Sequence, residues 1–313
     1  MRENVYDIII LGGGAAGLSA GIYTSRAKMR TLILNEGTVG GQMVLTHEIA
    51  NYPGVEHING YRLARTMSNQ AKSFGCEIKS NVRINALDLA GGLKTVEVSG
   101  KGTFSAKAVI IASGGRARKL EVPGEDKFQG NGISYCATCD GDFFQDKEII
   151  VVGGGNSALE EAVSLTTYAS KVTIIHEFDH FQAYPTAVED AQNNRKIRFI
   201  MESTIAEFRG DVSLKEAIIR HIPSGRLTKM SIDGAFIFIG YVPNTESFEG
   251  IVELNERKEI VVNGDKATTV PGVFAAGDAI AKKYRQVSTA VADGTIAALS
   301  AIEFIHKNEV REK

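Results

Sequence analysis

Short apolar runs alternate with longer helical patterns along the first part of the chain. Residues 6–11 form an apolar run, residues 12–14 are glycines, residues 15–28 have a helical pattern, and residues 31–34 form a second apolar run. This order predicts a βαβ unit with a glycine turn between the first strand and the helix. Buried runs alternating with helices are typical of parallel sheets in the doubly wound α/β class.

The same pattern returns in the middle of the chain. Residues 149–152 and 172–175 are apolar runs, separated by three glycines and a helical stretch that reaches residue 168. We therefore predict an α/β fold with two doubly wound, Rossmann-like dinucleotide-binding domains. Proline-containing segments at 119–124 and 240–244 follow apolar strands and mark the expected crossings. The second domain, residues 118–243, is then inserted in the first, residues 1–117 and 244–313.

Composition narrows the class of protein. The chain has 313 residues, enough for two domains, with 43% hydrophobic residues, 23% charged residues and a formal net charge of −2. It lacks the basic excess typical of nucleic-acid binding. The apolar run near the N-terminus is too short for a signal or membrane-spanning segment. We expect a cytoplasmic protein with no nucleic-acid or membrane partner.

The first glycine turn has the spacing G-x-G-x-x-G. Gly12, Gly14 and Gly17 hold the glycine positions, and Ala15 and Ala16 lie between them. Such a turn lets main-chain N–H groups approach a pyrophosphate at the start of a helix. At the end of the second strand, 22 residues after the second of these glycines, an acidic side chain is placed to accept hydrogen bonds from a ribose hydroxyl; this residue is Glu36.

The second turn has Gly153, Gly155 and Ala158 at the fingerprint positions, and Glu177 follows at the same offset. A turn retained for packing without a ligand is the alternative interpretation here. Two further strands, in residues 108–114 and 270–278, end in small residues, and we expect Asp278 to point at a ligand edge. A structural turn is the alternative for both.

Cys136 and Cys139 form a C-x-x-C pair directly followed by Asp140. Two thiols within disulfide reach and an adjacent carboxyl group are what thiol–disulfide exchange requires. The pair is not expected to bind zinc, because a zinc site needs four ligands and a second Cys or His pair is missing. No metal site is predicted. Two incidental cysteines in a turn remain the alternative. The third cysteine, Cys76, is expected to be an inert, partly buried thiol.

Taken with the glycine turns, the segment Cys136-Ala137-Thr138-Cys139-Asp140 makes the chain resemble the low-molecular-weight thioredoxin reductases over essentially its whole length. The resemblance implies FAD in the first domain, Cys139 nearer the flavin, Cys136 attacking thioredoxin, Asp140 as proton donor or acceptor, and a homodimer. It implies that the flavin is surrounded by the first glycine turn and by Gly41, Gln42, Asn51, Ala112, Gly114, Gly277, Asp278, Arg285 and Gln286.

The chain departs from this family at the second domain. NADPH-using members carry H-R-R-x-x-x-R after the second strand of that domain. Here His176 is kept, but the three arginine positions are filled by Glu177, Phe178 and Gln182. Losing several charge-assisted contacts, each on the order of 1.5–3 kcal/mol, should weaken NADPH binding by orders of magnitude. The alternative is that basic residues such as Arg195 or Lys196 replace the clamp.

Two candidate electron donors for the flavin remain, NADH and reduced ferredoxin. A third hypothesis is that the protein is not a turnover enzyme. Glu177 is the acidic residue that an NADH site would use to bind both ribose hydroxyls. Residues 176–181 also resemble the ferredoxin-dependent flavin thioredoxin reductase branch, which lacks the nucleotide clamp. We favour reduced ferredoxin over NADH, because Phe178 adds bulk where a polar clamp would lie. A flavin-bound redox sensor without turnover is the third hypothesis.

Overall fold

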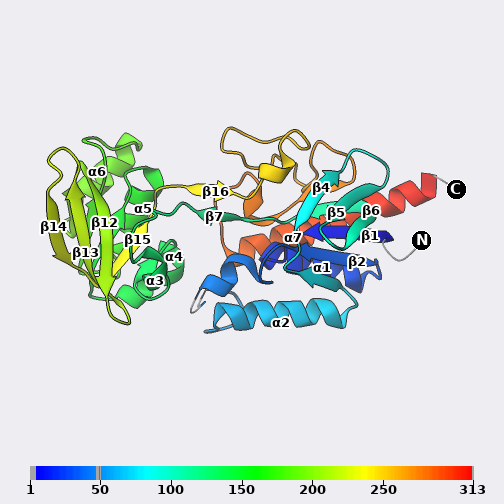
Figure 1. Ribbon diagram of the computed structural model, residues 1–313, viewed down its shortest axis with the longest axis horizontal. Helices are drawn as coiled ribbons and strands as arrows, with labels where there is room; N and C mark the ends of the chain where they lie inside the picture. The colour runs from blue at the N-terminus through cyan, green and yellow to red at the C-terminus, as the bar shows by residue number, and fades with distance from the viewer. Residues whose placement is uncertain (1–4, 47–48, 50, 312–313) are drawn as a thin grey trace. The chain divides into compact units, whose positions relative to one another are not determined.

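The computed structural model describes residues 5–46, 49 and 51–311, and its chain forms two compact units. Unit 1 comprises residues 1–116 and 242–313, and unit 2 comprises residues 117–241. Both boundaries lie close to the crossings expected from the sequence. The mixed α/β class predicted for the chain is confirmed (Figure 1).

Unit 1 is built on a seven-stranded sheet in the order β3-β2-β1-β6-β5-β4, with β17 paired to β6. The pairs among β3, β2, β1, β6 and β17 are parallel, whereas β4, β5 and the first half of β6 form an antiparallel meander. The strands are β1 Val5–Leu11, β2 Thr31–Asn35, β3 Glu77–Ser80, β4 Ile84–Asp88, β5 Lys94–Val98, β6 Gly102–Ile111 and β17 Val273–Ala275.

Strand β1 is buried on both faces, which explains its continuous apolar run. Ile8 and Ile10 enter one core with the helices of this unit, and Ile9 and Leu11 enter the other core. Successive side chains on a strand point to opposite faces of its sheet, so both faces must be apolar. The helices are α1 Ala15–Arg26, α2 Gly60–Ser73 and α7 Val287–Arg311.

Helix α7 is long and apolar enough to span a membrane by length and composition alone. Its alanines Ala297, Ala298 and Ala301, together with Ile305, are buried in the core that also contains α1. These contacts account for its apolar composition as that of a core helix.

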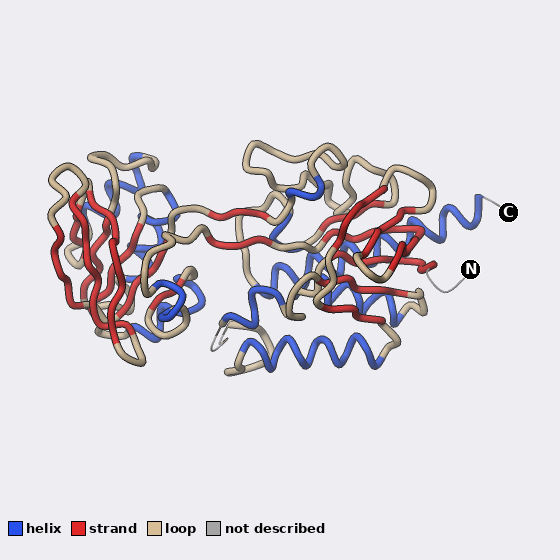
Figure 2. The backbone as a smooth tube through the Cα atoms, viewed as in Figure 1, coloured by secondary structure: helices blue, strands red, loops and turns tan. Residues whose placement is uncertain are grey.

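Unit 2 has a parallel five-stranded sheet in the order β11-β10-β9-β15-β8 and a separate antiparallel sheet β12-β13-β14 (Figure 2). Ile149 and Val151 of β9 face a core with α5 and α6, and Ile150 and Val152 face a core shared with the antiparallel sheet. The strands are β8 Ile133–Ser134, β9 Glu148–Val152, β10 Lys171–Ile175, β11 Ile197–Ile200, β12 Ser203–Gly210, β13 Leu214–His221, β14 Leu227–Ser231 and β15 Gly234–Ile237.

Four α-helices and the short 3-10 helix Gly141–Phe144 belong to unit 2, and two short strands lead into and out of it. The helices are α3 Glu125–Phe128, α4 Ala137–Asp140, α5 Asn156–Leu165 and α6 Pro185–Asn193. The linking strands β7 Gly115–Ala117 and β16 Tyr241–Pro243 pair with each other as a two-stranded ladder.

Two predicted helices were too long. Helix α1 ends at Arg26, because Lys28 takes a left-handed backbone conformation with φ of 64° that a right-handed helix does not contain. Helix α5 ends at Leu165, and the Thr166 hydroxyl group donates to the Val163 carbonyl in the turn that follows. In both places the chain must reverse to enter the next parallel strand.

Candidate active site

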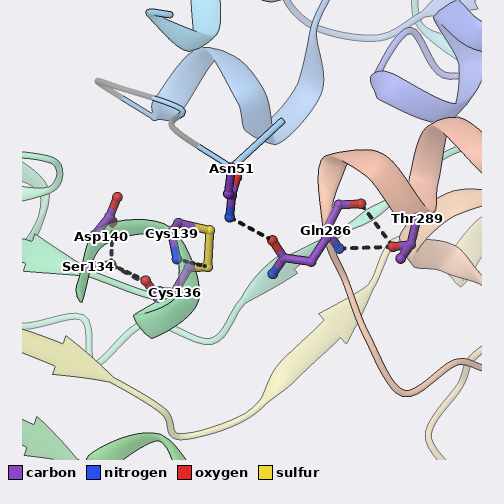
Figure 3. The surroundings of a disulfide bond; sticks show 7 residues. All are labelled: Asn51, Ser134, Cys136, Cys139, Asp140, Gln286 and Thr289. Carbon is purple, nitrogen blue, oxygen red and sulfur yellow. Dashed lines mark hydrogen bonds between the residues drawn. A yellow bond between two sulfur atoms is a disulfide. The ribbon is translucent and has the colours of Figure 1, made fainter. Parts of the chain in front are cut away.

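The predicted dithiol forms a disulfide directly after an edge strand of the unit 2 sheet. Strand β8 leads into Cys136, which caps the one-turn helix α4, and Cys136 is bonded to Cys139 with an S–S distance of 2.08 Å. The N–H of Cys139 donates to the Cys136 sulfur atom at 3.2 Å (Figure 3). After reduction the same N–H group would stabilise a thiolate on Cys136, which favours this thiol as the nucleophile.

Asp140 lies at the end of the same turn. Its Oδ2 atom accepts a 2.6 Å hydrogen bond from the Ser134 hydroxyl group. Burial raises the pKa of Asp140 above its ordinary value, the Ser134 hydrogen bond lowers the pKa, and the nearby Asp142 carboxylate raises it. A carboxyl group with a raised pKa on the residue that follows Cys139 is suited to proton transfer.

The residue before the dithiol is held by a buried acid. The carboxylate of Glu125 is 2% exposed and accepts the Tyr135 hydroxyl group at 2.7 Å. It also accepts the main-chain N–H groups of Leu120 and Glu121, at 3.0 and 2.7 Å. The redox segment is therefore tied to the segment by which the chain enters unit 2.

Cys76 is a buried residue in the core of unit 1. The thiol is buried between helices and sheet, and burial raises its pKa to about 11. A thiol held neutral at physiological pH is a poor nucleophile, in agreement with the inert role expected for it.

The first glycine turn of unit 1 needs its glycines for three different reasons. Gly12 has φ of 113°, and a Cβ there would lie 2.2 Å from the Ala112 carbonyl oxygen. A Cβ on Gly17 would lie 1.9 Å from the Gly12 carbonyl oxygen, so this glycine sets the approach of α1 to β1. Gly14 faces open space, with only the Gly41 Cα at 4.0 Å. A pyrophosphate group can approach the main chain of the turn at this open position.

Two other predicted flavin residues lie against this turn, and the remaining ones are placed by their own elements and contacts. Gly41 approaches Gly14, and a Cβ on Gly277 would lie 2.8 Å from the Ala16 Cβ. The Asn51 side-chain amide donates to the Gln286 side chain at 3.2 Å (Figure 3). Ala15 is the first residue of α1, Gln42 lies exposed in the short helix Gly41–Leu45, and Gly114 follows β6 with φ of 64°.

Asn35, which the sequence reading did not single out, supports the turn from the end of β2. Its Oδ1 atom accepts the Gly13 N–H at 2.8 Å, and its side chain is buried. The neighbouring Glu36 is exposed, and its carboxylate accepts the Ile84 N–H at 3.2 Å. The fingerprint drew attention to the acidic residue, although the amide one position earlier carries the contact with the turn.

Two predicted residues form ion pairs with other parts of unit 1. Arg285 pairs with the buried Glu259. Asp278 pairs with Lys282 at 3.1 Å, and the same ammonium group also contacts Asp293 at 2.9 Å. Each side chain is thus held in place by a charge that the motif spacing did not reveal.

The unit 1 site fits a dinucleotide. Helix α1 begins at the turn with neither a side-chain cap nor an acidic residue in its first turn, so its N–H groups suit a pyrophosphate. The Ser113 hydroxyl oxygen, next to the turn, is buried without a hydrogen-bond partner among the described residues. The Gly14 opening and this polar atom are features that a bound cofactor would use.

The unit 2 turn has the same backbone but a different side-chain environment. The His176 ring lies over Gly154, where an added Cβ would fall 2.4 Å from the ring. Phe181 stacks on this ring at 5.8 Å, Phe178 meets its edge at 5.3 Å, and Phe178 also stacks on His180. These four rings form an aromatic cluster where the arginine clamp would begin.

The loop after β10 is folded against the turn. The Gln182 N–H donates to the Gly154 carbonyl at 2.9 Å, and the Glu202 N–H donates to the Phe178 carbonyl at 3.1 Å. The side chains of Glu177 and Gln182 are exposed. An exposed carboxylate and an amide therefore stand at two of the former arginine positions.

Lys196 and Arg195 do not replace the clamp. The Lys196 ammonium group donates to the carbonyls of Thr166 and Ala169, at 2.7 and 2.9 Å. Both basic residues precede β11, at the amino edge of a parallel sheet, whereas nucleotides bind at the carboxyl edge. The structure overturns this alternative.

Comparisons with known proteins agree with the two units and the dithiol. The family model described as "Pyridine nucleotide-disulphide oxidoreductase" matches residues 6–294. The chain is 44% identical to a thioredoxin reductase of Peptoclostridium acidaminophilum over 98% of this chain and 99% of that protein. It is 42% identical to a thioredoxin reductase of Bacillus subtilis over 98% and 96%.

A solved structure supports the same relationship. The thioredoxin reductase of Streptococcus pyogenes superposes with a TM-score of 0.93 at 36% identity, covering 98% of this chain and 100% of that one. The chain therefore belongs to the thioredoxin reductases of the pyridine nucleotide-disulphide oxidoreductase family, flavoprotein enzymes for which FAD is the implied cofactor.

Proposed function

We propose that this protein is an FAD-dependent thioredoxin reductase whose Cys136–Cys139 pair carries electrons to thioredoxin, and that reduced ferredoxin rather than NADPH supplies them. The observation that carries the first part is the disulfide directly followed by the half-buried Asp140 in a chain of this family. FAD, when bound, would accept electrons from the donor and pass two of them to the disulfide. The residues to hold it are those around the first glycine turn.

The exchange step follows from the geometry of the redox turn. The Cys136 thiolate attacks one sulfur atom of the thioredoxin disulfide, and one thioredoxin thiolate leaves. Cys139 then attacks the Cys136 sulfur atom, which restores the Cys136–Cys139 disulfide and releases the second thioredoxin thiolate. Thioredoxin gains two electrons and two protons, and Asp140 transfers one of those protons.

The surroundings of the second glycine turn support a donor other than NADPH. Glu177 and Asp179 are exposed carboxylates on the loop after β10, where Asp179 contacts His180 at 2.6 Å. The lysine and arginine residues nearest in sequence, Lys171 and Arg195, lie at the opposite edge of the sheet. A 2′-phosphate would meet repulsion there instead of a clamp. Phe178 packs on His176 and His180, which supports a partner that does not require a polar nucleotide clamp.

NADH is the second candidate donor, and one observation favours it. Glu177 lies exposed directly after the second strand of the unit, where an acidic side chain would accept both ribose hydroxyls.

We further propose a homodimer, which the resemblance implies.

The donor is tested by following the flavin absorbance anaerobically after mixing the purified protein with NADPH, NADH or reduced ferredoxin. We expect fast bleaching with ferredoxin and negligible bleaching with NADPH. Fast bleaching by NADH alone would replace ferredoxin by NADH, and fast bleaching by NADPH would overturn the role given to the loop. Thioredoxin reduction with the effective donor then separates a reductase from a redox sensor.

A matched pair of variants sharpens this test. The triple variant Glu177→Arg, Phe178→Arg and Gln182→Arg should gain bleaching by NADPH, since each charge-assisted contact is worth on the order of 1.5–3 kcal/mol. Arg195→Ala, at the other edge of the sheet, should leave the response to every donor unchanged.

A further inference from the structure

A single buried hydroxyl group connects the two ends of the redox turn. The Ser134 side chain is 5% exposed, accepts the Cys136 N–H at 3.0 Å, and lies 2.6 Å from Asp140 Oδ2 (Figure 3). A hydroxyl group has one proton and two lone pairs. Because the Cys136 N–H occupies a lone pair, the proton is available to an acceptor, and the Asp140 carboxylate at 2.6 Å is a closer acceptor than the Cys136 carbonyl at 3.3 Å.

We propose that Ser134 is a positioning residue for disulfide exchange, which orients the Asp140 carboxyl group beside the two thiols and sets the pH range over which that group transfers protons. The inference rests on the proposed function. When thioredoxin is reduced, the two enzyme thiols lose two electrons and two protons to the thioredoxin sulfur atoms, and the Asp140 carboxyl group relays one of these protons. Ser134 itself exchanges no electrons.

The electrostatic surroundings give the direction of the effect. Burial and Asp142, on the short helix Gly141–Phe144, raise the pKa of Asp140, while the Ser134 hydrogen bond opposes them. Helix α5 packs against α4 and carries Glu160 and Glu161. Because the Ser134 hydrogen bond lowers the Asp140 pKa against burial and Asp142, its removal moves the pKa of Asp140 further upward.

The test uses the holoenzyme, reduced with dithionite and freed from excess reductant, and mixed anaerobically with oxidised thioredoxin between pH 5 and 10. For Ser134→Ala we expect the limb of the rate profile that reports Asp140 to move by roughly one pH unit to higher pH. Ser134→Thr retains the hydroxyl group and should restore the wild-type profile. Ser170→Ala removes an exposed hydroxyl group that donates to the Lys147 carbonyl and serves as the control.

A second comparison separates positioning from general damage. In an Asp140→Asn background, Ser134→Ala should cause no further shift, because the group through which Ser134 acts is gone. Coincident profiles for wild type and Ser134→Ala, or the same shift in both backgrounds, would overturn the inference. If the wild-type protein reduces no thioredoxin disulfide at any pH, the proposed function fails instead.

Discussion

The Tyr135 hydroxyl group donates to Glu125 across the core of unit 2, 2.7 Å away. Burial, the largest contribution, and the Glu125 carboxylate both raise the pKa of Tyr135, so this phenol stays protonated and remains a donor. Tyr135 directly precedes Cys136, and the carboxylate that it meets also binds the segment entering unit 2. The hydrogen bond therefore fixes the start of the redox turn.

Tyr135→Phe should lower the free energy of unfolding by about 1–2 kcal/mol, because one donor to a buried carboxylate is lost. Urea unfolding followed by circular dichroism measures the change. Tyr61→Phe, at an exposed position on α2, is the control and should have little effect. Equal stability of the two variants would mean that Glu125 is satisfied by its two main-chain donors.

Asn35→Ala should weaken FAD binding about tenfold, which corresponds to about 1.4 kcal/mol. The reason is that the Gly13 N–H loses its acceptor and the glycine turn loses a support. Fluorescence titration of the apoprotein with FAD measures the dissociation constant. Asn85→Ala, on the exposed strand β4, should bind FAD like the wild type, and a normal affinity of Asn35→Ala would remove this residue from the site.

Lys282→Met should destabilise unit 1 by about 1.5–3 kcal/mol, since Asp278 and Asp293 both lose a charged partner. Asp293 keeps its 2.8 Å ion pair with Lys266. Lys282 is the cation between Asp278 and Asp293, whereas the adjacent Lys283 is exposed. Thermal unfolding and FAD retention during gel filtration provide two readouts. Lys283→Met is the matched control; if it loses as much stability as Lys282→Met, the ion-pair explanation is wrong.

Cys76 should make stability fall at alkaline pH. Burial raises the pKa of its thiol from 9.0 to about 11, so the folded chain retains this proton to higher pH than the unfolded chain. The stabilisation is present below about pH 9 and is lost as the pH rises toward 11, a change of about 3 kcal/mol. Urea unfolding at several pH values should therefore give a shallower alkaline decline for Cys76→Ala than for wild type.

The main-chain conformation of the first glycine turn could be predicted from the sequence, because its glycines are required by local steric constraints. Gly12 needs a positive φ, and Gly17 needs the absence of a Cβ, so spacing alone located the turn. The C-x-x-C pair was equally local, since four consecutive residues bring both sulfur atoms into bonding distance. These features required no knowledge of distant parts of the chain.

The side chains that support the site were not readable in the same way. Lys282 and Glu259 act on Asp278 and Arg285 through ion pairs that depend on how the strands and α7 pack. Asn35 was overlooked because the fingerprint specifies an acidic residue, while a buried amide can also accept a main-chain N–H. Such contacts are decided by tertiary structure.

The glycine turns of the two units are closed by equivalent main-chain hydrogen bonds. Gly40 donates its N–H to the Gly13 carbonyl in unit 1, and Gln182 donates its N–H to the Gly154 carbonyl in unit 2. Because Gln182 closes the turn with its main chain, its exposed side chain takes no part in that hydrogen bond. A substitution at this exposed position can therefore change what the rim of the unit 2 turn recognises while the main-chain closure of the turn is kept.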